Sequence, residues 1–186
     1  MTRQHTLGIF YLFLLWSAMI VPLLMMRPLW PIIETRYVSV AWEMWLRHDF
    51  LVPYLNGVPY SHKPPLLFWM IQAGWWLFGV NSWWPRLVPS IFTFGSIILL
   101  LRIGRLLWPE DRDIGKYLPF MLLGSLLWNF YMTFVMFDLL VAFSAVLGIY
   151  GLLYGLQRNR LYGFMLFGFA IGLGILSKGP VILVTL

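Results

Sequence analysis

The sequence has no cysteine and little charge. Of its 186 residues only 11% are charged, as 13 Lys or Arg and 7 Asp or Glu. The absence of thiols excludes both a disulfide framework and a thiolate metal site. So little charge, in a chain that is 61% hydrophobic with a mean hydropathy of +0.80, also excludes an ordinary soluble domain. The composition therefore predicts an integral membrane protein.

The net charge of +6 would suggest a nucleic-acid partner in a soluble protein. Here most basic residues stand beside apolar runs, where they set the orientation of the chain and meet anionic lipid. We therefore infer that the chain does not bind nucleic acid.

The apolar runs predict a single all-α transmembrane domain over residues 1–186. The first run, 7–26, is long enough to cross a hydrocarbon core of roughly 30 Å. It exceeds the apolar core of a signal peptide and lacks a small-residue cleavage site, so we expect it to remain as an anchor. The sequence stops just inside another run, which predicts an amino-terminal portion of a longer protein. The further spans are predicted at 87–103, 117–136, 139–156 and 161–176, with the start of another at 181.

The segment 65–80 decides which side of the membrane each later loop occupies. If it does not span and the amino terminus is inside, seven cations lie inside, against six spread over longer outer segments. If it spans, only three lie inside and ten outside. The positive-inside rule favours the first layout. Its inner cations are Arg3, Arg102, Arg105, Arg112, Lys116, Arg158 and Arg160.

This layout leaves a long outer loop, 27–86, with two interfacial helices at about 35–47 and 65–80. The first is amphipathic, with polar residues three and four positions apart and a Val, Ala and Trp face. Within it Glu43 and Arg47 are expected to form an i, i+4 ion pair. The second is rich in aromatic residues, which suit the membrane interface. Between them, Asn56-Gly57 and the prolines predict turns.

Small residues recur at helix-packing spacing in two of the predicted spans. They occur in "GIYGLLYG", residues 148–155, and in "GFAIGLG", residues 168–174. Small side chains let two helix backbones approach closely. Both stretches are therefore predicted to contact neighbouring helices.

The scarce ionisable residues gather on the predicted outer side. Ammonium and guanidinium groups hold phosphate oxygens well, so cations beside lipid point to a phosphate or pyrophosphate ligand. Glu34 is the first acid after the first span, and desolvation would raise its pKa toward that of a general base. The members of this outer set are Glu34, Arg36, Lys63, Arg86, Asp138 and Lys178.

Each of these residues also has a plainer interpretation. Glu34 is equally suited to complement the positive end of the helix that follows it. Asp138 fits a polar turn between spans, and Lys178 could reach the headgroups. Headgroup contact is a full alternative for the arginines Arg27, Arg36 and Arg47. His62, beside Lys63, leaves a divalent metal site open, although it has no evident second ligand in the sequence.

Several separated motifs resemble one family. The stretches "ETRY", "VPYLNGVPYSHKPP" and "WLFG", then Asp138 and "SKGP", follow in the order of the aminoarabinose-transferase-like branch of the protein-mannosyltransferase superfamily. These are integral membrane glycosyltransferases of the GT-C fold. The pattern of that family's first outer loop contains Asp-Glu-Thr-Arg-Tyr, Val-Pro, Phe-Glu-Lys-Pro and Leu-Phe-Gly. The resemblance covers nearly the whole chain.

The resemblance implies a function. It implies transfer of a sugar from a polyprenyl-phosphate donor to a lipid, glycan or protein acceptor, with inversion, on the outer face of the bacterial cytoplasmic (inner) membrane. Glu34 would be catalytic, Lys63 would hold phosphate, and Asp138 and Lys178 would line the cavity. The full set of implied binding residues is Arg36, Tyr37, Tyr60, His62, Lys63, Arg86, Asp138 and Lys178.

Two departures from the family pattern leave alternatives open. Ile33 stands where the family pattern Asp-Glu-Thr-Arg-Tyr has its Asp, so Glu34 is the surviving acid of that pair. His62 stands where the family often has Glu before Lys-Pro. The second departure puts a carboxylate-based metal contact in doubt. A catalytically inactive lipid-binding or assembly subunit, and a transporter of a polyprenyl-linked sugar, are the two rival functions.

Overall fold

The computed structural model describes residues 3–186, and the side chains of residues 8–111 and 117–186. Nearly all of its regular structure is helical. The elements, in order, are α1 (Arg3–Met26), α2 (Glu34–Arg47), β1 (Tyr54–Leu55), β2 (Val58–Pro59), α3 (Leu66–Phe78), α4 (Trp83–Leu107), α5 (Arg112–Gly124), α6 (Leu126–Tyr131), α7 (Asp138–Gln157), α8 (Arg160–Lys178), the 3-10 turn η1 (Gly179–Val181) and α9 (Ile182–Thr185).

Four helical stretches among the described residues are long and apolar enough to cross a membrane. They are Gly8–Met26 in α1, Trp83–Leu107, Asp138–Gln157 and Arg160–Thr185. The chain is therefore a multi-pass membrane protein. The interfacial segment predicted at 65–80 forms the shorter apolar helix α3, Leu66–Phe78.

The predicted span 117–136 is not one continuous helix. Helix α5 begins earlier, at Arg112, and ends at Gly124, while α6 covers only Leu126–Tyr131. Ser125 separates them because its backbone is extended, with φ −72° and ψ 120°. Residues 132–137 form a connection without regular helix before α7. This connection becomes important at the site.

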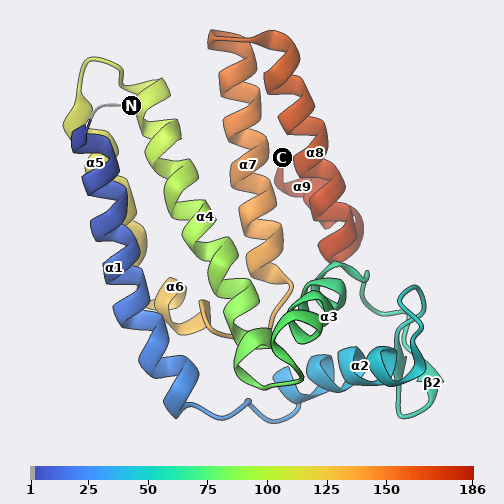
Figure 1. The fold of residues 1–186 in the computed structure, drawn as a ribbon. Helices are drawn as coiled ribbons and strands as arrows, with labels where there is room; N and C mark the ends of the chain where they lie inside the picture. Colours follow the sequence, from blue (N-terminus) through green and yellow to red (C-terminus); the bar gives the residue numbers. More distant parts are fainter. Residues whose placement is uncertain (1–2) are drawn as a thin grey trace.

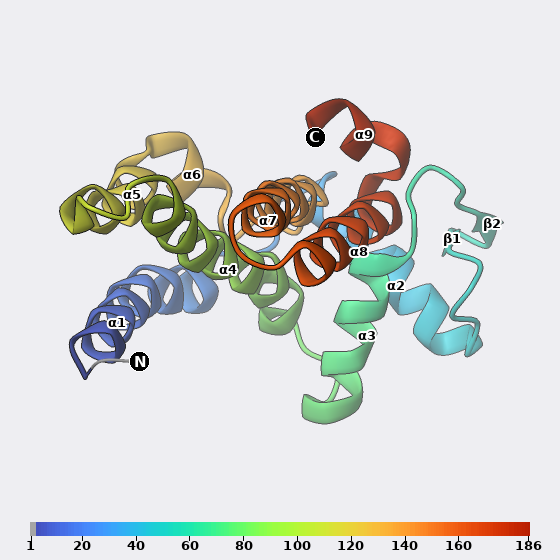
Figure 2. The same ribbon diagram turned by 90° about the horizontal axis from the view of Figure 1, so that it is seen from above.

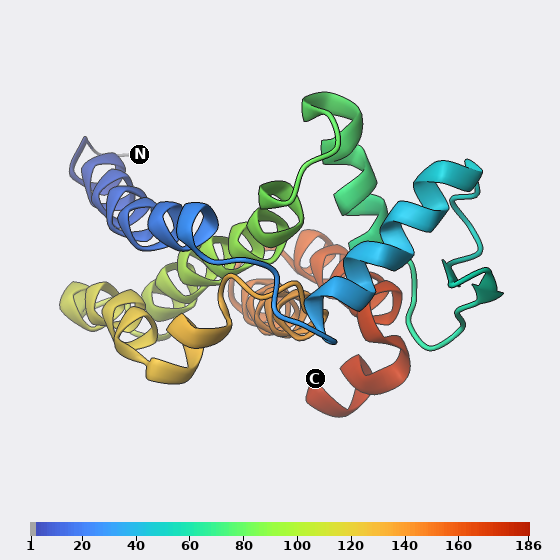
Figure 3. The ribbon, with the colours of Figure 1, turned by 90° about the horizontal axis from the view of Figure 1, so that it is seen from below.

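The long helices run side by side, and the interfacial elements gather at one end of them (Figure 1). That end is where α1 and α8 finish and where α4 and α7 begin. Seen from above, α4, α7 and α8 lie next to one another, with α1 and α5 to one side and α2, α3 and the hairpin to the other (Figure 2). From below, the chain leaving α1 passes across this end to reach α2 beside the α6–α7 connection (Figure 3).

Helix α2 is amphipathic, as predicted, but its buried face is not the predicted Val38, Ala41, Trp42 and Trp45: of these only Ala41 is fully buried, and Trp42 is exposed. Its buried face, Val40, Ala41 and Met44, packs with the buried Phe68 and Ile71 of α3 in one apolar cluster. Burying an aliphatic side chain of this size is worth about 1.5–3 kcal/mol. The pairing of α2 and α3 therefore forms one packed apolar layer at this end of the long helices.

The loop between these helices contains a short hairpin, β1–β2. Its two-residue turn is Asn56-Gly57, with φ of 55° and 78°, the pair of positive values that a type I′ turn requires. The Glu43 carboxylate accepts hydrogen bonds from the N–H groups of both turn residues, the Gly57 bond at 3.0 Å. The predicted Glu43–Arg47 pairing is replaced by this contact, and the Arg47 guanidinium lies 4.2 Å from the centre of the Tyr54 ring.

Helices α7 and α8 pack closely through glycines. A Cβ added to Gly163 would lie 2.2 Å from the Gly155 Cα, and one added to Gly151 would lie 2.8 Å from the Phe167 N. The "GIYGLLYG" stretch thus makes the predicted contact. In "GFAIGLG" the prediction holds only in part: Gly174 faces the side chain of Ile182, whereas Gly168 and Gly172 have nothing within 4 Å.

Candidate functional site

A polar cavity of about 610 Å³ lies between α2 and the loop that follows the hairpin. Two cations, two phenols and one imidazole line it, with no carboxylate among the residues that form its wall. The positive charge of Arg36 and Lys63 makes it suitable for an anion. The lining residues are Arg36, Tyr37, Leu55, Val58, Pro59, Tyr60, His62 and Lys63.

The local fold explains how α2 and the loop meet at this cavity. Tyr37 is on the buried face of α2, while its neighbour Arg36 is exposed, with its guanidinium 5.3 Å from the centre of the Tyr37 ring. On the loop side, the N–H of Tyr60 donates to the carbonyl of Pro53 at 2.7 Å, which closes the hairpin and turns the chain toward His62. Two short segments therefore bring their polar side chains to one wall.

Tyr60 is a neutral donor at physiological pH. Its side chain is largely buried, and this burial raises the pKa of the phenol above its ordinary value of 10.0. The positive charge of Arg36 acts in the opposite direction, and Tyr37 adds to the increase in pKa. The phenol O–H is therefore available as a hydrogen-bond donor to an anion in the cavity.

Lys63 connects the cavity to the start of α7. Its ammonium lies 5.8 Å from the centre of the Phe137 ring. That ring is buried, and it packs edge-on against Tyr37, at 5.0 Å between centres, and against Phe68, at 5.4 Å. Phe137 directly precedes Asp138, so the lysine and the amino-terminal end of α7 are held near one another.

Asp138 and Lys178, forty positions apart in the sequence, form an ion pair at 2.5 Å. The Asp138 side chain is 61% exposed and that of Lys178 is 30% exposed. Asp138 also lies at the wall of a second cavity, of about 430 Å³, which is mostly apolar and includes Trp128 and Tyr131. The two residues predicted to line a cavity are thus brought together, but neither lines the polar cavity, and only Asp138 lines the second one.

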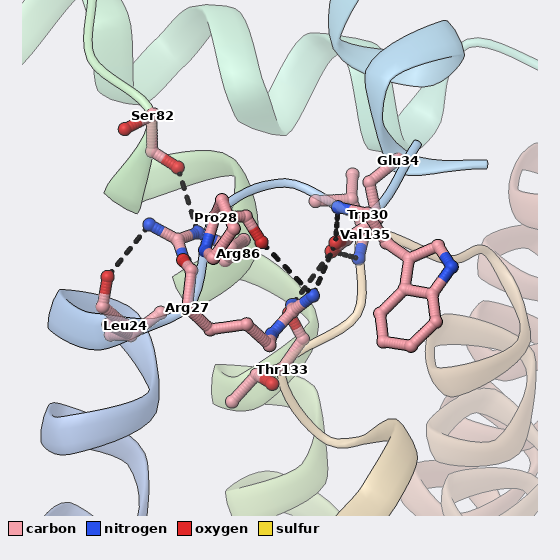
Figure 4. Close-up of polar contacts among 9 residues, drawn as sticks. All are labelled: Leu24, Arg27, Pro28, Trp30, Glu34, Ser82, Arg86, Thr133 and Val135. Atoms are coloured by element: carbon pink, nitrogen blue, oxygen red, sulfur yellow. Dashed lines mark hydrogen bonds and ion pairs between the residues drawn. The ribbon is translucent and has the colours of Figure 1, made fainter. Parts of the chain in front are cut away.

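Glu34, the predicted catalytic acid, is completely buried and lines neither cavity. Its carboxylate accepts hydrogen bonds from both terminal nitrogens of Arg27, at 2.6 and 3.0 Å, and from the N–H groups of Trp30, at 2.6 Å, and Val135, at 2.8 Å (Figure 4). Four donors occupy the sites that a proton-accepting carboxylate would need free. The structure thus places Glu34 in a buried hydrogen-bond network, and its catalytic role stays a prediction.

The two arginines near Glu34, Arg27 and Arg86, bind other parts of the chain. Arg27, for which headgroup contact was an open interpretation, has a side chain only 17% exposed because it pairs with Glu34. Arg86, predicted to bind substrate, is buried and donates to the backbone carbonyls of Ser82, at 3.1 Å, Leu24, at 2.7 Å, and Arg27 (Figure 4). It ties the end of α1 to the start of α4.

Within the described residues, no group of three or more His, Asp or Glu side chains gathers that could hold a metal ion. His62 lies 5.2 Å from Tyr60 between ring centres, in the polar cavity. Its place supports contact with an anion in that cavity.

Sequence reasoning missed the interactions that cross between segments. Neither the pairing of Arg27 with Glu34 nor that of Asp138 with Lys178 follows from spacing along one helix. The sequence does contain one indication of these pairs. Each of the four charged residues stands beside an apolar run, where an unpaired charge costs free energy, so each is expected to have a partner.

Comparisons with known proteins support a common family. The family model described as dolichyl-phosphate-mannose-protein mannosyltransferase matches residues 62–186, more than half of the chain. A curated relative from Photorhabdus laumondii, named undecaprenyl phosphate-alpha-4-amino-4-deoxy-L-arabinose arabinosyl transferase, is 31% identical over 157 residues. That alignment covers 82% of this chain and 28% of the relative.

A second curated relative carries the same name. It is from Pseudomonas aeruginosa and is 33% identical over 154 residues, covering 81% of this chain and 28% of the relative. The chain thus spans less than a third of the length of the curated relatives it matches.

The fold is also that of a solved protein. The crystal structure of ArnT from Cupriavidus metallidurans bound to undecaprenyl phosphate superposes with a TM-score of 0.84 at 23% identity, covering 97% of this chain and 33% of that one. The apo structure gives a TM-score of 0.83. The chain therefore has the helical architecture of a GT-C membrane protein, with two interfacial helices between its first two long helices. On the family-model match, the chain belongs to the dolichyl-phosphate-mannose-protein mannosyltransferase family.

Proposed function

We propose that this chain forms the lipid-phosphate-binding part of a membrane glycosyltransferase. The enzyme would move a sugar from a polyprenyl-phosphate donor to a lipid, glycan or protein acceptor on the outer face of the bacterial cytoplasmic membrane. The observation that carries the proposal is the acid-free, cation-lined cavity beside the interfacial helices. The names of the relatives, and the undecaprenyl phosphate bound to a protein of the same fold, support the choice of ligand.

The cavity residues have defined roles in this proposal. The Lys63 ammonium and the Arg36 guanidinium bind the phosphate oxygens, and the neutral Tyr60 phenol donates a further hydrogen bond. In an inverting transfer, the acceptor oxygen forms a bond to the anomeric carbon while the bond from that carbon to the phosphate oxygen breaks, and the proton of a hydroxyl acceptor passes to an oxygen of the departing phosphate. The polyprenyl phosphate leaves with the electron pair and gains negative charge, so prearranged cations stabilise it most at the transition state.

The lipid chain of the donor needs an apolar surface that begins close to the cavity where its phosphate binds. The second cavity, with its mostly apolar wall, adjoins the start of α7 near the Phe137 ring that Lys63 faces. A headgroup at Lys63 therefore has apolar surface within reach, as an amphiphilic donor requires. Tyr37 completes the polar wall on the α2 side, and His62 on the loop side.

One observation favours a second candidate, a subunit that binds the lipid phosphate without transferring the sugar. Ile33 stands where the family pattern has an acid, and the oxygens of Glu34 are taken by four donors. No acceptor-activating carboxylate lines the polar cavity. Sugar transfer with a radiolabelled donor, measured beside binding, separates the two: both functions require binding, and only the first gives product.

The direct test is binding of undecaprenyl phosphate to the chain in lipid nanodiscs. Replacing Lys63 with Gln should weaken binding by about tenfold or more, because a charge-assisted hydrogen bond contributes about 1.5–3 kcal/mol and 1.4 kcal/mol is tenfold. Arg158→Gln is the matched control, since it removes the same charge from an exposed position at the opposite end of α7. Equal losses in both variants would mean that net charge, and not the cavity, holds the ligand.

A further inference from the structure

Two segments distant in the sequence, residues 27–34 and 133–135, meet at one buried carboxylate. Glu34 opens α2, Arg27 directly follows α1, Trp30 lies between them, and Val135 belongs to the connection between α6 and α7. Arg27 also donates to the carbonyl of Thr133 at 3.0 Å. The carboxylate and the guanidinium together therefore hold the 133–135 connection against the start of α2 (Figure 4).

The same connection is also bound by α4. The Ser90 hydroxyl donates to the carbonyl of Met132 at 2.6 Å. The Arg27 guanidinium stacks 4.5 Å from the centre of the Phe134 ring. Met132, Thr133 and Val135 are all buried. A connection without regular secondary structure is thus fixed at nearly every residue, which is unusual for a loop and indicates that its position has a use.

That position determines the geometry of the polar cavity. Phe137 follows Val135 by two residues, and its ring packs on Tyr37 and faces Lys63. Arg36 and Tyr37, in turn, follow Glu34 by two and three residues on α2. The α2 wall of the cavity, and the Phe137 ring that contacts both Tyr37 and Lys63, are therefore within three residues of the atoms that the Glu34 carboxylate joins.

We propose that Glu34 and Arg27 form a positioning clamp, which sets the α2 wall of the polar cavity relative to Phe137 and Lys63. Glu34 is a positioning residue that acts through the backbone of Val135, and it does not exchange protons with substrate. This inference rests on the proposed function, since the ligand of the cavity is taken to be a polyprenyl phosphate.

The clamp makes a distinctive prediction for binding. Replacing a catalytic base slows the reaction without weakening ligand binding, whereas replacing a residue of the clamp weakens binding itself. Glu34→Gln and Arg27→Gln should each raise the Kd for undecaprenyl phosphate about tenfold. The reason is that the headgroup is bound well only when the α2 wall is held in a fixed position relative to Lys63. Because the two residues act as one unit, the double variant should bind about as weakly as either single variant.

The experiment titrates undecaprenyl phosphate into the chain in nanodiscs, well below the thermal unfolding midpoint of every variant. Gly163→Ala controls for general destabilisation, since it disturbs the α7–α8 contact and leaves the clamp intact. It should lower the midpoint without changing Kd. Hydrogen exchange at the Val135 N–H gives a local readout: it should become faster in Glu34→Gln and in Arg27→Gln, and should stay unchanged in Gly163→Ala.

Where the glutamine variants do not fold, Arg27→Lys and Glu34→Asp replace them, since each keeps its charge and loses part of the hydrogen-bond geometry. These two variants should also raise Kd, by a smaller factor than the glutamine variants. Wild-type protein that fails to bind undecaprenyl phosphate overturns the proposed function and the clamp with it. Wild-type protein that binds, with unchanged affinity in the clamp variants or with independent, additive losses, overturns the clamp alone.

Discussion

At the scale of single residues, the site depends on which charges are paired. Arg36 and Lys63 face the polar cavity, while the charges of Arg27 and Glu34 neutralise one another in the protein interior. The sequence predicted that all four lie on one side of the membrane, because they flank apolar runs, and their segments do lie at one end of the long helices. It could not assign their partners, since Arg27 and Glu34 meet through a turn whose shape depends on contacts with residues 133–135.

Tyr60 gives a prediction about pH at this scale. Burial raises the pKa of its phenol in the folded protein above the ordinary value of 10.0, so the folded state holds this proton more tightly than the unfolded state. The resulting stability is fully present below the unfolded pKa and is lost as the pH rises from about 10 through the folded pKa. Thermal unfolding in nanodiscs at increasing alkaline pH measures this loss.

The matched variant is Tyr60→Phe, which keeps the ring and removes the titrating group. We expect the decline in unfolding midpoint above pH 10 to be shallower in this variant than in the wild type. An equally steep decline in both proteins would mean that other groups cause the alkaline loss and that the Tyr60 phenol is not protected by burial.

At the scale of elements, local sequence signals were most reliable where the structure is local. Asn56-Gly57 predicted a turn because both residues tolerate positive φ, and the turn is there. The span 117–136 was misjudged because hydropathy does not register an extended residue such as Ser125. The hydropathy of 132–137 is equally uninformative, since these residues form an irregular connection fixed by α2 and α4.

The hairpin turn can be tested by substitution. Gly57→Ala places a side chain at φ 78°, which costs roughly 1–2 kcal/mol for a non-glycine residue. We expect faster hydrogen exchange at the Tyr60 N–H, whose bond to Pro53 closes the hairpin. Asn56→Gly is the control, because it also accepts a positive φ. Unchanged exchange in Gly57→Ala would show that Glu43, and not the turn geometry, sets the hairpin's stability.

The α7–α8 contact gives a second prediction for an element. Gly163→Ala adds a methyl group where a Cβ would be 2.2 Å from the Gly155 Cα, so the helices must separate. Overpacking of this kind costs about 1–3 kcal/mol, and the unfolding midpoint should fall accordingly. Gly168→Ala, in the same helix with open space around its Cα, should leave the midpoint unchanged or slightly higher. A fall of similar size in both variants would contradict close packing at Gly163.

At the scale of the whole molecule, the charge distribution predicts which end of the long helices faces outward. Helices α2 and α3 lie at the end of the long helices where α7 begins and α8 finishes (Figure 1). The polar cavity is lined from α2 and the loop after it, and Asp138 and Lys178 are the first residue of α7 and the last of α8. Arg158 and Arg160 lie at the other end, where α7 ends and α8 begins. The side chains of Arg3, Arg112 and Lys116, counted with them in the sequence, lie outside the described side chains. The count predicts that the cavity end faces outward.

Chemical labelling of single cysteines tests this orientation most directly, and the cysteine-free chain provides a silent background. Ser61→Cys places a thiol beside the polar cavity, and Gln157→Cys places one at the opposite end, both at exposed positions. In intact bacterial spheroplasts, a membrane-impermeant maleimide should label Ser61→Cys at once and Gln157→Cys only after the membrane is permeabilised. Labelling of Gln157→Cys in intact spheroplasts, with Ser61→Cys protected until permeabilisation, would contradict an outward-facing lipid-phosphate site.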